Sequence, residues 1–172
     1  FETVATAGSA VVNDDATTPG VIAASDLKAL VDADGVTVID IRSHDAFVAG
    51  HIPGAYHSSL TTLMADLSSG AIPNDKPYVV ACYSGQSAGH AKIAMEMMGY
   101  DVSSLLFGMS SWNSATRAPW DNATINAAIA DRNVLTNPET MNNNGDLTVQ
   151  EFPALAGDAG TAVETAVATM LA

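Results

Sequence analysis

The sequence predicts an α/β domain with a parallel sheet, followed by a mainly helical C-terminal extension. Three observations support this prediction. Strand-like and helix-like segments alternate between Val21 and Trp112, which is the order of elements typical of an α/β domain. The run from Tyr78 to Cys82 is continuously apolar, as expected for a strand buried on both faces of a parallel sheet. From residue 113 onward, Asn, Thr and Ala become frequent and helical patterns follow.

The elements of the α/β segment are expected in a regular order. The first strand is predicted over Val36 to Ile41, and a helix is predicted around Leu60 to Leu67. The buried strand follows over Tyr78 to Cys82, and a last strand is predicted over Val102 to Leu106.

A helix is predicted between the last two strands. Apolar side chains recur there at helical spacing, at Ala91, Ala94, Met95 and Met98. Lys92 and Glu96 form an i,i+4 pair on this helix, and Gly99 supplies a stop signal. The methionines, including Met97, are interpreted as core residues rather than soft metal ligands.

The two ends of the chain differ from the domain between them, which is predicted over residues 21–113. Residues 1–20 carry three acidic residues and no basic one, so an arm or linker is expected. Residues 114–172 are predicted to pack on the core, with helices over Thr124 to Arg132 and Asp158 to Leu171. The second helix has one apolar stripe, formed by Val163, Ala166, Val167 and Met170.

Length and charge exclude several classes of protein. A chain of 172 residues fits one domain of ordinary size, and 15% charged residues is typical of a globular rather than a disordered chain. The net charge of -13 repels phosphate backbones and anionic lipids, so no nucleic-acid or membrane-surface partner is expected. No apolar run is long enough to insert into a membrane. Nothing in the sequence indicates an oligomeric state.

The chain begins at Phe1 without an initiator methionine, which favours a mature exported protein and an extracytoplasmic (periplasmic or secreted) location.

Its single cysteine, Cys82, cannot form an internal disulfide, so the role of this thiol needs another explanation.

Cys82 is predicted to stand at the carboxyl end of a buried strand, directly before a short polar loop and a helix. Ligands of open α/β sheets bind in this crevice. Backbone N–H groups of the loop and the amino end of the following helix stabilise an anion at the sulfur. These features favour a nucleophilic thiolate over an inert buried cysteine.

The sequence resembles the rhodanese family of single-domain sulfurtransferases over about residues 21–113. Four motifs in order support the resemblance: Val38-Ile39-Asp40-Ile41-Arg42, Gly50-His51-Ile52-Pro53-Gly54-Ala55, Cys82-Tyr83-Ser84-Gly85-Gln86-Ser87 and Gly108-Met109-Ser110-Ser111-Trp112. The resemblance implies an open, mostly parallel sheet flanked by helices.

The resemblance also implies a reaction without cofactor or metal. Cys82 would take a sulfane sulfur from thiosulfate, polysulfide or a persulfide and pass it to cyanide or a thiol. The donor would be bound by loop residues, namely Tyr83, Ser84, Gly85, Gln86 and Ser87. Arg42 either contacts the donor or braces the loops by pairing with Asp40. Ser87 stands where many members of the family carry Arg, so the donor stays open.

Two other functions remain open. A phosphatase or arsenate reductase would need Arg six residues after the nucleophile, where this chain has Ala88. A non-enzymatic binding or sulfur-carrier module would keep the fold without turnover, although this chain retains the nucleophile.

Two further features are interpreted as structural. The four histidines, at positions 44, 51, 57 and 90, lack the spacing of metal ligands, and His51 is expected to be a hydrogen-bonded turn residue. The segment from Asn142 to Asp146 resembles the start of an EF-hand loop, but Pro153 stands where a bidentate Glu is needed. A polar turn is therefore favoured over a calcium site.

Overall fold

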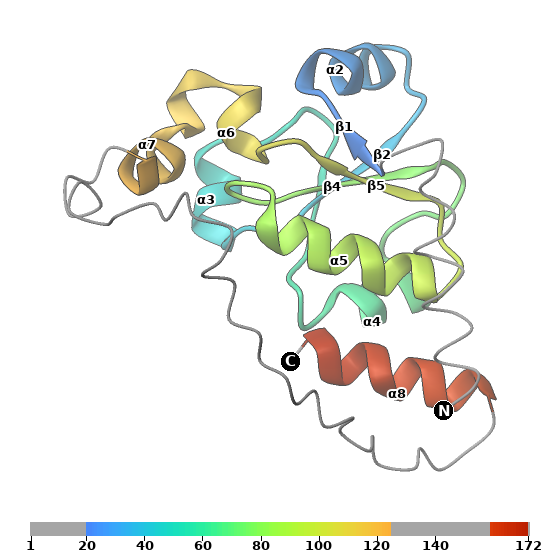
Figure 1. Ribbon diagram of the computed structural model, residues 1–172. Coiled ribbons are helices and arrows are strands. Elements are labelled where there is room, and N and C mark those ends of the chain that lie inside the picture. The colour runs from blue at the N-terminus through green and yellow to red at the C-terminus, as the bar shows by residue number, and fades with distance from the viewer. Residues whose placement is uncertain (1–19, 125–158, 172) are drawn as a thin grey trace, which may run out of the picture.

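A five-stranded parallel sheet forms the centre of the computed structural model, which describes residues 20–124 and 159–171 (Figure 1). The strands lie in the order β1-β5-β4-β2-β3, and each neighbouring pair is parallel. Their bounds are Val21–Ile22 (β1), Thr37–Asp40 (β2), Tyr56–His57 (β3), Tyr78–Ala81 (β4) and Val102–Leu105 (β5). The predicted open α/β sheet is confirmed.

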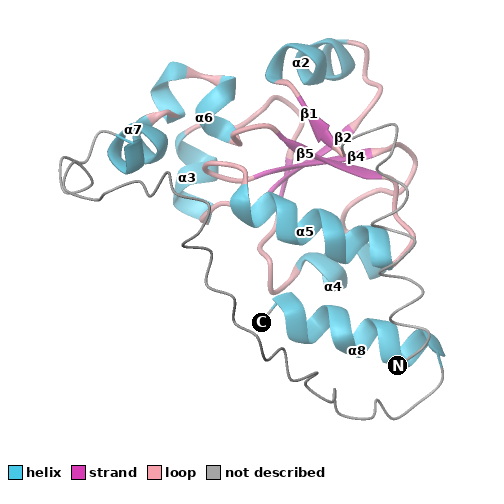
Figure 2. Cartoon of the chain, viewed as in Figure 1, coloured by secondary structure: helices cyan, strands magenta, loops and turns pink. Residues whose placement is uncertain are grey.

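Helices follow or precede each strand and cover both faces of the sheet (Figure 2). Their bounds are Ala24–Asp32 (α2), His44–Ala49 (α3), Leu63–Ser68 (α4), Gln86–Met97 (α5), Met109–Trp112 (α6), Ala118–Thr124 (α7) and Ala159–Leu171 (α8), with a 3-10 turn at Ser114–Thr116 (η1). Among the described helices, none combines the length and apolar character needed to cross a membrane.

Strand β4 is buried on both faces because its side chains alternate between two cores. Tyr78, Val80 and the following Cys82 pack with α4 and α5 on one face. Val79 and Ala81 face the opposite way and pack with residues of α2 and α6. This alternation explains why the sequence of the strand is continuously apolar.

Helix α5 lies between the sheet and a third layer formed by α8. Met95 of α5 faces the sheet, whereas Ala94 packs with buried residues of α8. Figure 1 shows α8 alongside α5, on the side away from the sheet. The predicted ion pair of α5 is present, with Lys92 Nζ and Glu96 Oε1 2.7 Å apart. Small residues along α5 therefore allow close packing on two sides.

The bounds of several elements, and the buried face of α8, differ from the sequence prediction. The helix expected from Leu60 begins at Leu63, because the preceding residues form a turn in which the Thr62 N–H donates to the Ser59 carbonyl at 3.2 Å. On α8 the buried stripe continues to Leu171, whereas Met170 is 43% exposed, because a spacing of four residues keeps side chains on one helix face.

Several predictions lie wholly or mostly outside the described residues. These are the N-terminal arm, the helix from Thr124 to Arg132, of which only Thr124 is described, and the turn from Asn142 to Asp146. The structure does not test the predicted domain boundaries, which stay predictions.

Replacing Val167 with alanine should lower the free energy of unfolding by about 2 kcal/mol, because two methyl groups are lost from a closely packed contact. Val167 is 1% exposed in the cluster between α8 and α5. Urea unfolding of the full chain measures the change, with Glu164→Ala on the exposed face of α8 as the control. Equal midpoints for both variants would contradict the described packing of α8.

Candidate functional site

Cys82 lies at the carboxyl edge of the sheet, directly after the centre of the parallel array. Ala81, the last residue of β4, pairs with Asp40 of β2. The chain then turns through Tyr83 and Ser84 and enters α5 at Gln86. The turn is possible because Gly85, which caps α5, adopts a φ of 98°, a conformation that favours glycine.

The thiol sulfur is held inside this turn. The Gly85 N–H donates a hydrogen bond to Cys82 Sγ at 3.0 Å, and Cys82 is 3% exposed. Because Gly85 is the amino cap of α5, the same N–H belongs to the positive end of the helix dipole. A sulfur anion at this position is therefore stabilised by a backbone donor and by the helix.

The cysteine loop packs against the segment that follows β5. Gly108 of this segment has a φ of 55° and lies against the backbone of the cysteine loop. A Cβ atom on Gly108 would meet the Cys82 carbonyl oxygen at 2.4 Å and the Ser84 nitrogen at 2.9 Å. The next residue, Met109, donates its N–H to the Cys82 carbonyl at 2.7 Å. The position of the loop therefore depends on glycine at position 108.

The sequence identifies Gly108 only as the first residue of a family motif and predicts no contact for it. A glycine in the turn that follows a strand indicates a positive φ or a close backbone contact, and the structure shows both at this position, three residues after the end of β5. The contact with the cysteine loop joins positions far apart in the sequence, so no local pattern could identify it.

Arg42 is 4% exposed and bridges two loops. Its Nε and Nη2 donate to the Asp40 carboxylate, with Nη2 and Oδ2 2.7 Å apart. Nη2 also donates to the Gly50 carbonyl at 2.6 Å. These contacts match the bracing role expected for Arg42, whereas contact with a donor stays a prediction.

The other predicted binding residues are arranged along the turn and the first turn of α5. Tyr83 is 39% exposed, its hydroxyl hydrogen-bonds Ser43 Oγ at 2.9 Å, and its ring centroid lies 5.8 Å from the Arg42 guanidinium carbon. Ser84 and Ser87 are half-buried, and Gln86 is exposed. The structure thus places these residues around the same turn, without testing which of them touch substrate.

Replacing Asp40 with asparagine should lower the free energy of unfolding by about 3 kcal/mol, because it leaves a buried guanidinium without its counter-charge. Chemical denaturation measures this loss. Asp121→Asn on α7 is the control, since Asp121 forms an exposed ion pair with Arg117. A loss no larger than that of the control would show that the Asp40–Arg42 pair does not hold the loops.

The histidines near the site have structural contacts. His51 Nδ1 lies 2.8 Å from the Phe47 carbonyl oxygen and therefore donates to it, and the two rings stack at 3.9 Å. His57 Nε2 donates to the Arg42 carbonyl at 2.9 Å. In residues 20–124 and 159–171, no group of three or more metal-ligating side chains gathers in one place.

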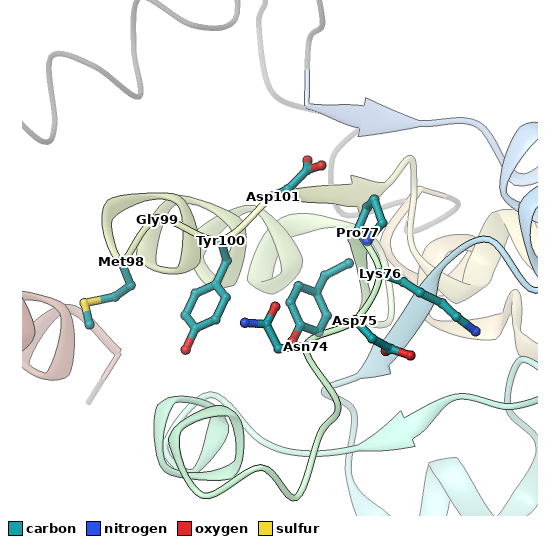
Figure 3. A pocket seen from close by; sticks show the side chains of 9 residues that line it. Asn74, Asp75, Lys76, Pro77, Met98, Gly99, Tyr100 and Asp101 are labelled. Atoms are coloured by element: carbon teal, nitrogen blue, oxygen red, sulfur yellow. The ribbon is translucent and has the colours of Figure 1, made fainter.

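Among the described residues, one pocket lies at each end of β4. The first, shown in Figure 3, has a volume of about 590 Å³ and lies where β4 and β5 begin, and its lining includes Asn74 and Tyr100. Burial raises the pKa of the nearby Tyr78 phenol, whose hydroxyl donates to the Pro73 carbonyl at 2.8 Å. This pocket is separated from Cys82 by the length of β4, roughly 13 Å at 3.3 Å per residue.

The second pocket, of about 380 Å³, lies beside the cysteine loop and is lined in part by Tyr83 and Arg42. Its position places it at the carboxyl edge of the sheet, where ligands of such folds bind.

Comparison with known proteins identifies a family model and curated relatives that match the α/β part of the chain. The model of the rhodanese-like domain family matches residues 23–115, which is more than half of the chain. The thiosulfate sulfurtransferase GlpE of Shewanella oneidensis is 34% identical over 95 residues, covering 55% of this chain and 92% of that protein. The protein of the same name from Pseudomonas putida is 39% identical over 82 residues, covering 47% and 73%.

Solved structures also resemble the chain. A rhodanese-related protein from Thermoplasma volcanium is 24% identical, with a TM-score of 0.49, and the match covers 54% of this chain and 88% of that one. A rhodanese-like domain protein from Staphylococcus aureus is 23% identical, with a TM-score of 0.49 and coverage of 54% and 90%.

Proposed function

Because the chain belongs to the rhodanese-like domain family, we propose that it is a sulfurtransferase that carries a sulfane sulfur on Cys82. The observation that most supports this proposal is the hydrogen bond from the Gly85 N–H to Cys82 Sγ. A loop that places a backbone donor on the sulfur stabilises both the attacking thiolate and the persulfide that it becomes. The names of the GlpE relatives support the same class of reaction.

The reaction has two steps. The Cys82 thiolate attacks the outer sulfur of thiosulfate, a new S–S bond forms, and the original S–S bond breaks with its electron pair leaving on sulfite. In the second step the acceptor, cyanide or a thiolate, attacks the outer sulfur of the persulfide. The S–S electron pair then returns to Cys82 Sγ. No electron is supplied from outside, so the cycle needs no redox cofactor.

The charge of the cysteine loop bears on the identity of the donor. No residue from Tyr83 to Ala88 carries a charge, and Ala88 is fully buried. The Arg42 guanidinium is already bound to Asp40. A dianion such as thiosulfate would therefore be held mainly by backbone N–H groups. Binding of polysulfide or a thiol persulfide depends less on a positively charged side chain in the loop.

Donor competition tests the proposal directly. Turnover with cyanide as acceptor is measured for thiosulfate, polysulfide and a thiol persulfide in parallel, and kcat/KM ranks the three donors. Cyanide-dependent release of thiocyanate with at least one donor is expected. A purified, folded chain that turns over none of them would be a binding module rather than an enzyme.

Replacing Ser87 with arginine should lower the KM for thiosulfate by about tenfold, because a charge-assisted hydrogen bond is added next to the sulfur. In the parent, thiosulfate turnover should rise between 0.01 M and 0.1 M salt, as the Debye length falls from about 30 Å to about 10 Å and repulsion by the acidic surface is screened.

Steady-state kinetics at both salt concentrations measure these effects, with Ser87→Gln as the uncharged control of similar length. Tight thiosulfate binding in the parent, with no response to salt or to Ser87→Arg, would show that the existing site binds the thiosulfate anion fully without an added positive charge.

A further inference from the structure

The pocket beside the cysteine loop has the size and lining of a site for a small organic molecule. It is an open hollow of about 380 Å³ between α3 and the segment that follows β5. Its apolar lining comes from both walls: Ala46, Ala49, Met109, Trp112, Ala115 and Pro119. An inorganic donor of a few atoms needs no such apolar space, so the lining points to a molecule with a hydrocarbon part.

Two lining residues connect this pocket to the nucleophile. Tyr83 is the residue directly after Cys82, and its half-exposed side chain forms part of the pocket wall. Met109 donates its backbone N–H to the Cys82 carbonyl at 2.7 Å. A molecule in the pocket therefore lies against the backbone that positions the sulfur.

Arg42 is the one cationic side chain among the described residues that line the pocket, beside the polar side chains of His51, Asn113 and Thr116. Its Nε and Nη2 are bound to Asp40 and Gly50, whereas Nη1 makes no hydrogen bond to the described residues. Because the Asp40 carboxylate 2.7 Å away compensates the charge of the guanidinium, Arg42 offers the pocket hydrogen-bond donors with little net positive charge. With a chain charge of -13, this arrangement favours a neutral acceptor oxygen over a carboxylate.

We propose that this pocket binds the organic part of the sulfur acceptor, a neutral thiol with an aromatic or similarly apolar body and a carbonyl oxygen. The inference rests on the proposed function. The carbonyl oxygen accepts from Arg42 Nη1 and the apolar body packs against Ala49 and Trp112. The acceptor thiol loses its proton to water, and its thiolate attacks the outer sulfur of the Cys82 persulfide. The S–S bond breaks, its electron pair stays on Cys82 Sγ, and the acceptor leaves as a persulfide.

Equilibrium binding tests the pocket independently of catalysis. Acetanilide, which has the phenyl ring and the carbonyl but no thiol, is titrated into the full chain by NMR or calorimetry. Ala49→Phe fills the pocket, and Val48→Phe is the matched control, because Val48 is the neighbouring residue of α3, is 65% exposed and does not line the pocket. Ala115→Phe fills the same pocket from the opposite wall, should Ala49→Phe fail to fold.

We expect the Kd for acetanilide to rise at least about tenfold in Ala49→Phe and to stay within about twofold in Val48→Phe. With mercaptoacetanilide, the thiol derivative of the same compound, as acceptor, the Michaelis constant should follow the same pattern, while turnover with cyanide stays unchanged. An anionic aromatic thiol, mercaptophenylacetate, should be the poorer acceptor in the parent.

The outcomes separate the two proposals. Absence of turnover with cyanide in the parent would refute the sulfurtransferase, and acetanilide binding would still report on the pocket. Weakened acetanilide binding with an unchanged Michaelis constant for the thiol would overturn the acceptor assignment. Equal Kd values in all variants, or a preference for the anionic thiol, would also overturn it.

Discussion

Cys82→Ser should abolish sulfur transfer to cyanide and to thiols, lowering kcat by at least about 10³-fold. Cys82 supplies the one thiol of the chain, and its sulfur accepts a hydrogen bond from the Gly85 N–H at 3.0 Å. A serine hydroxyl is a far weaker nucleophile toward sulfane sulfur and is scarcely ionised at neutral pH. The loop itself should persist, because serine is close to cysteine in size and the same N–H can donate to its oxygen.

The measurement combines steady-state turnover with the free energy of unfolding. Ser68→Ala, an exposed substitution on α4, is a control for handling and purity. Turnover by Cys82→Ser above about one per cent of the parent would contradict a cysteine nucleophile. A large drop in stability would instead show that the sulfur has a packing role.

Gly108→Ala should have the second largest effect, with turnover reduced by about 10²-fold and the free energy of unfolding lowered by about 4 kcal/mol. The added Cβ would lie 2.4 Å from the Cys82 carbonyl oxygen and 2.8 Å from the Gly85 nitrogen, so one of the two segments must move. Movement of Gly85 displaces the donor that holds the sulfur. The positive φ of position 108 adds strain of its own.

Gly99→Ala is the control that separates backbone strain at a positive φ from the steric contact of an added Cβ with the cysteine loop. Gly99 has a φ of 87° at the end of α5, and a Cβ there would have no neighbour within 4 Å. Its alanine variant should lose about 1 kcal/mol of stability and little activity. If both variants behave alike, the close contact of Gly108 with the cysteine loop does not position the sulfur.

The fold could be predicted well from local patterns. The apolar run at Tyr78 requires burial on both faces, and the structure confirms it through two cores that share β4. The stop at Gly99 is also confirmed, because this residue adopts a positive φ just after α5. The sequence patterns do not predict β1, β3, α2, α3, α6 or α7 individually. The two strands have only two residues each, and α7 includes a proline and shows no apolar period.

The candidate site could be predicted only in part. The sequence places Cys82 at a strand end before a polar loop, which predicts a nucleophilic thiolate, whereas sulfur transfer is what the family resemblance implies. The contact of Gly108 with the loop and the pocket between α3 and η1 depend on tertiary structure, which joins segments that share no local pattern. The roles of the residues from Tyr83 to Ser87, and the extracytoplasmic location, stay predictions.

Intact-mass spectrometry of the purified chain after incubation with a sulfane donor tests the central claim most directly. The account predicts that the mass rises by one sulfur atom, that peptide mapping places this sulfur on Cys82, and that cyanide removes it with release of thiocyanate. Cys82→Ser should gain no mass under the same conditions. A folded parent that acquires no cyanide-releasable sulfur from thiosulfate, polysulfide or a thiol persulfide would contradict the account.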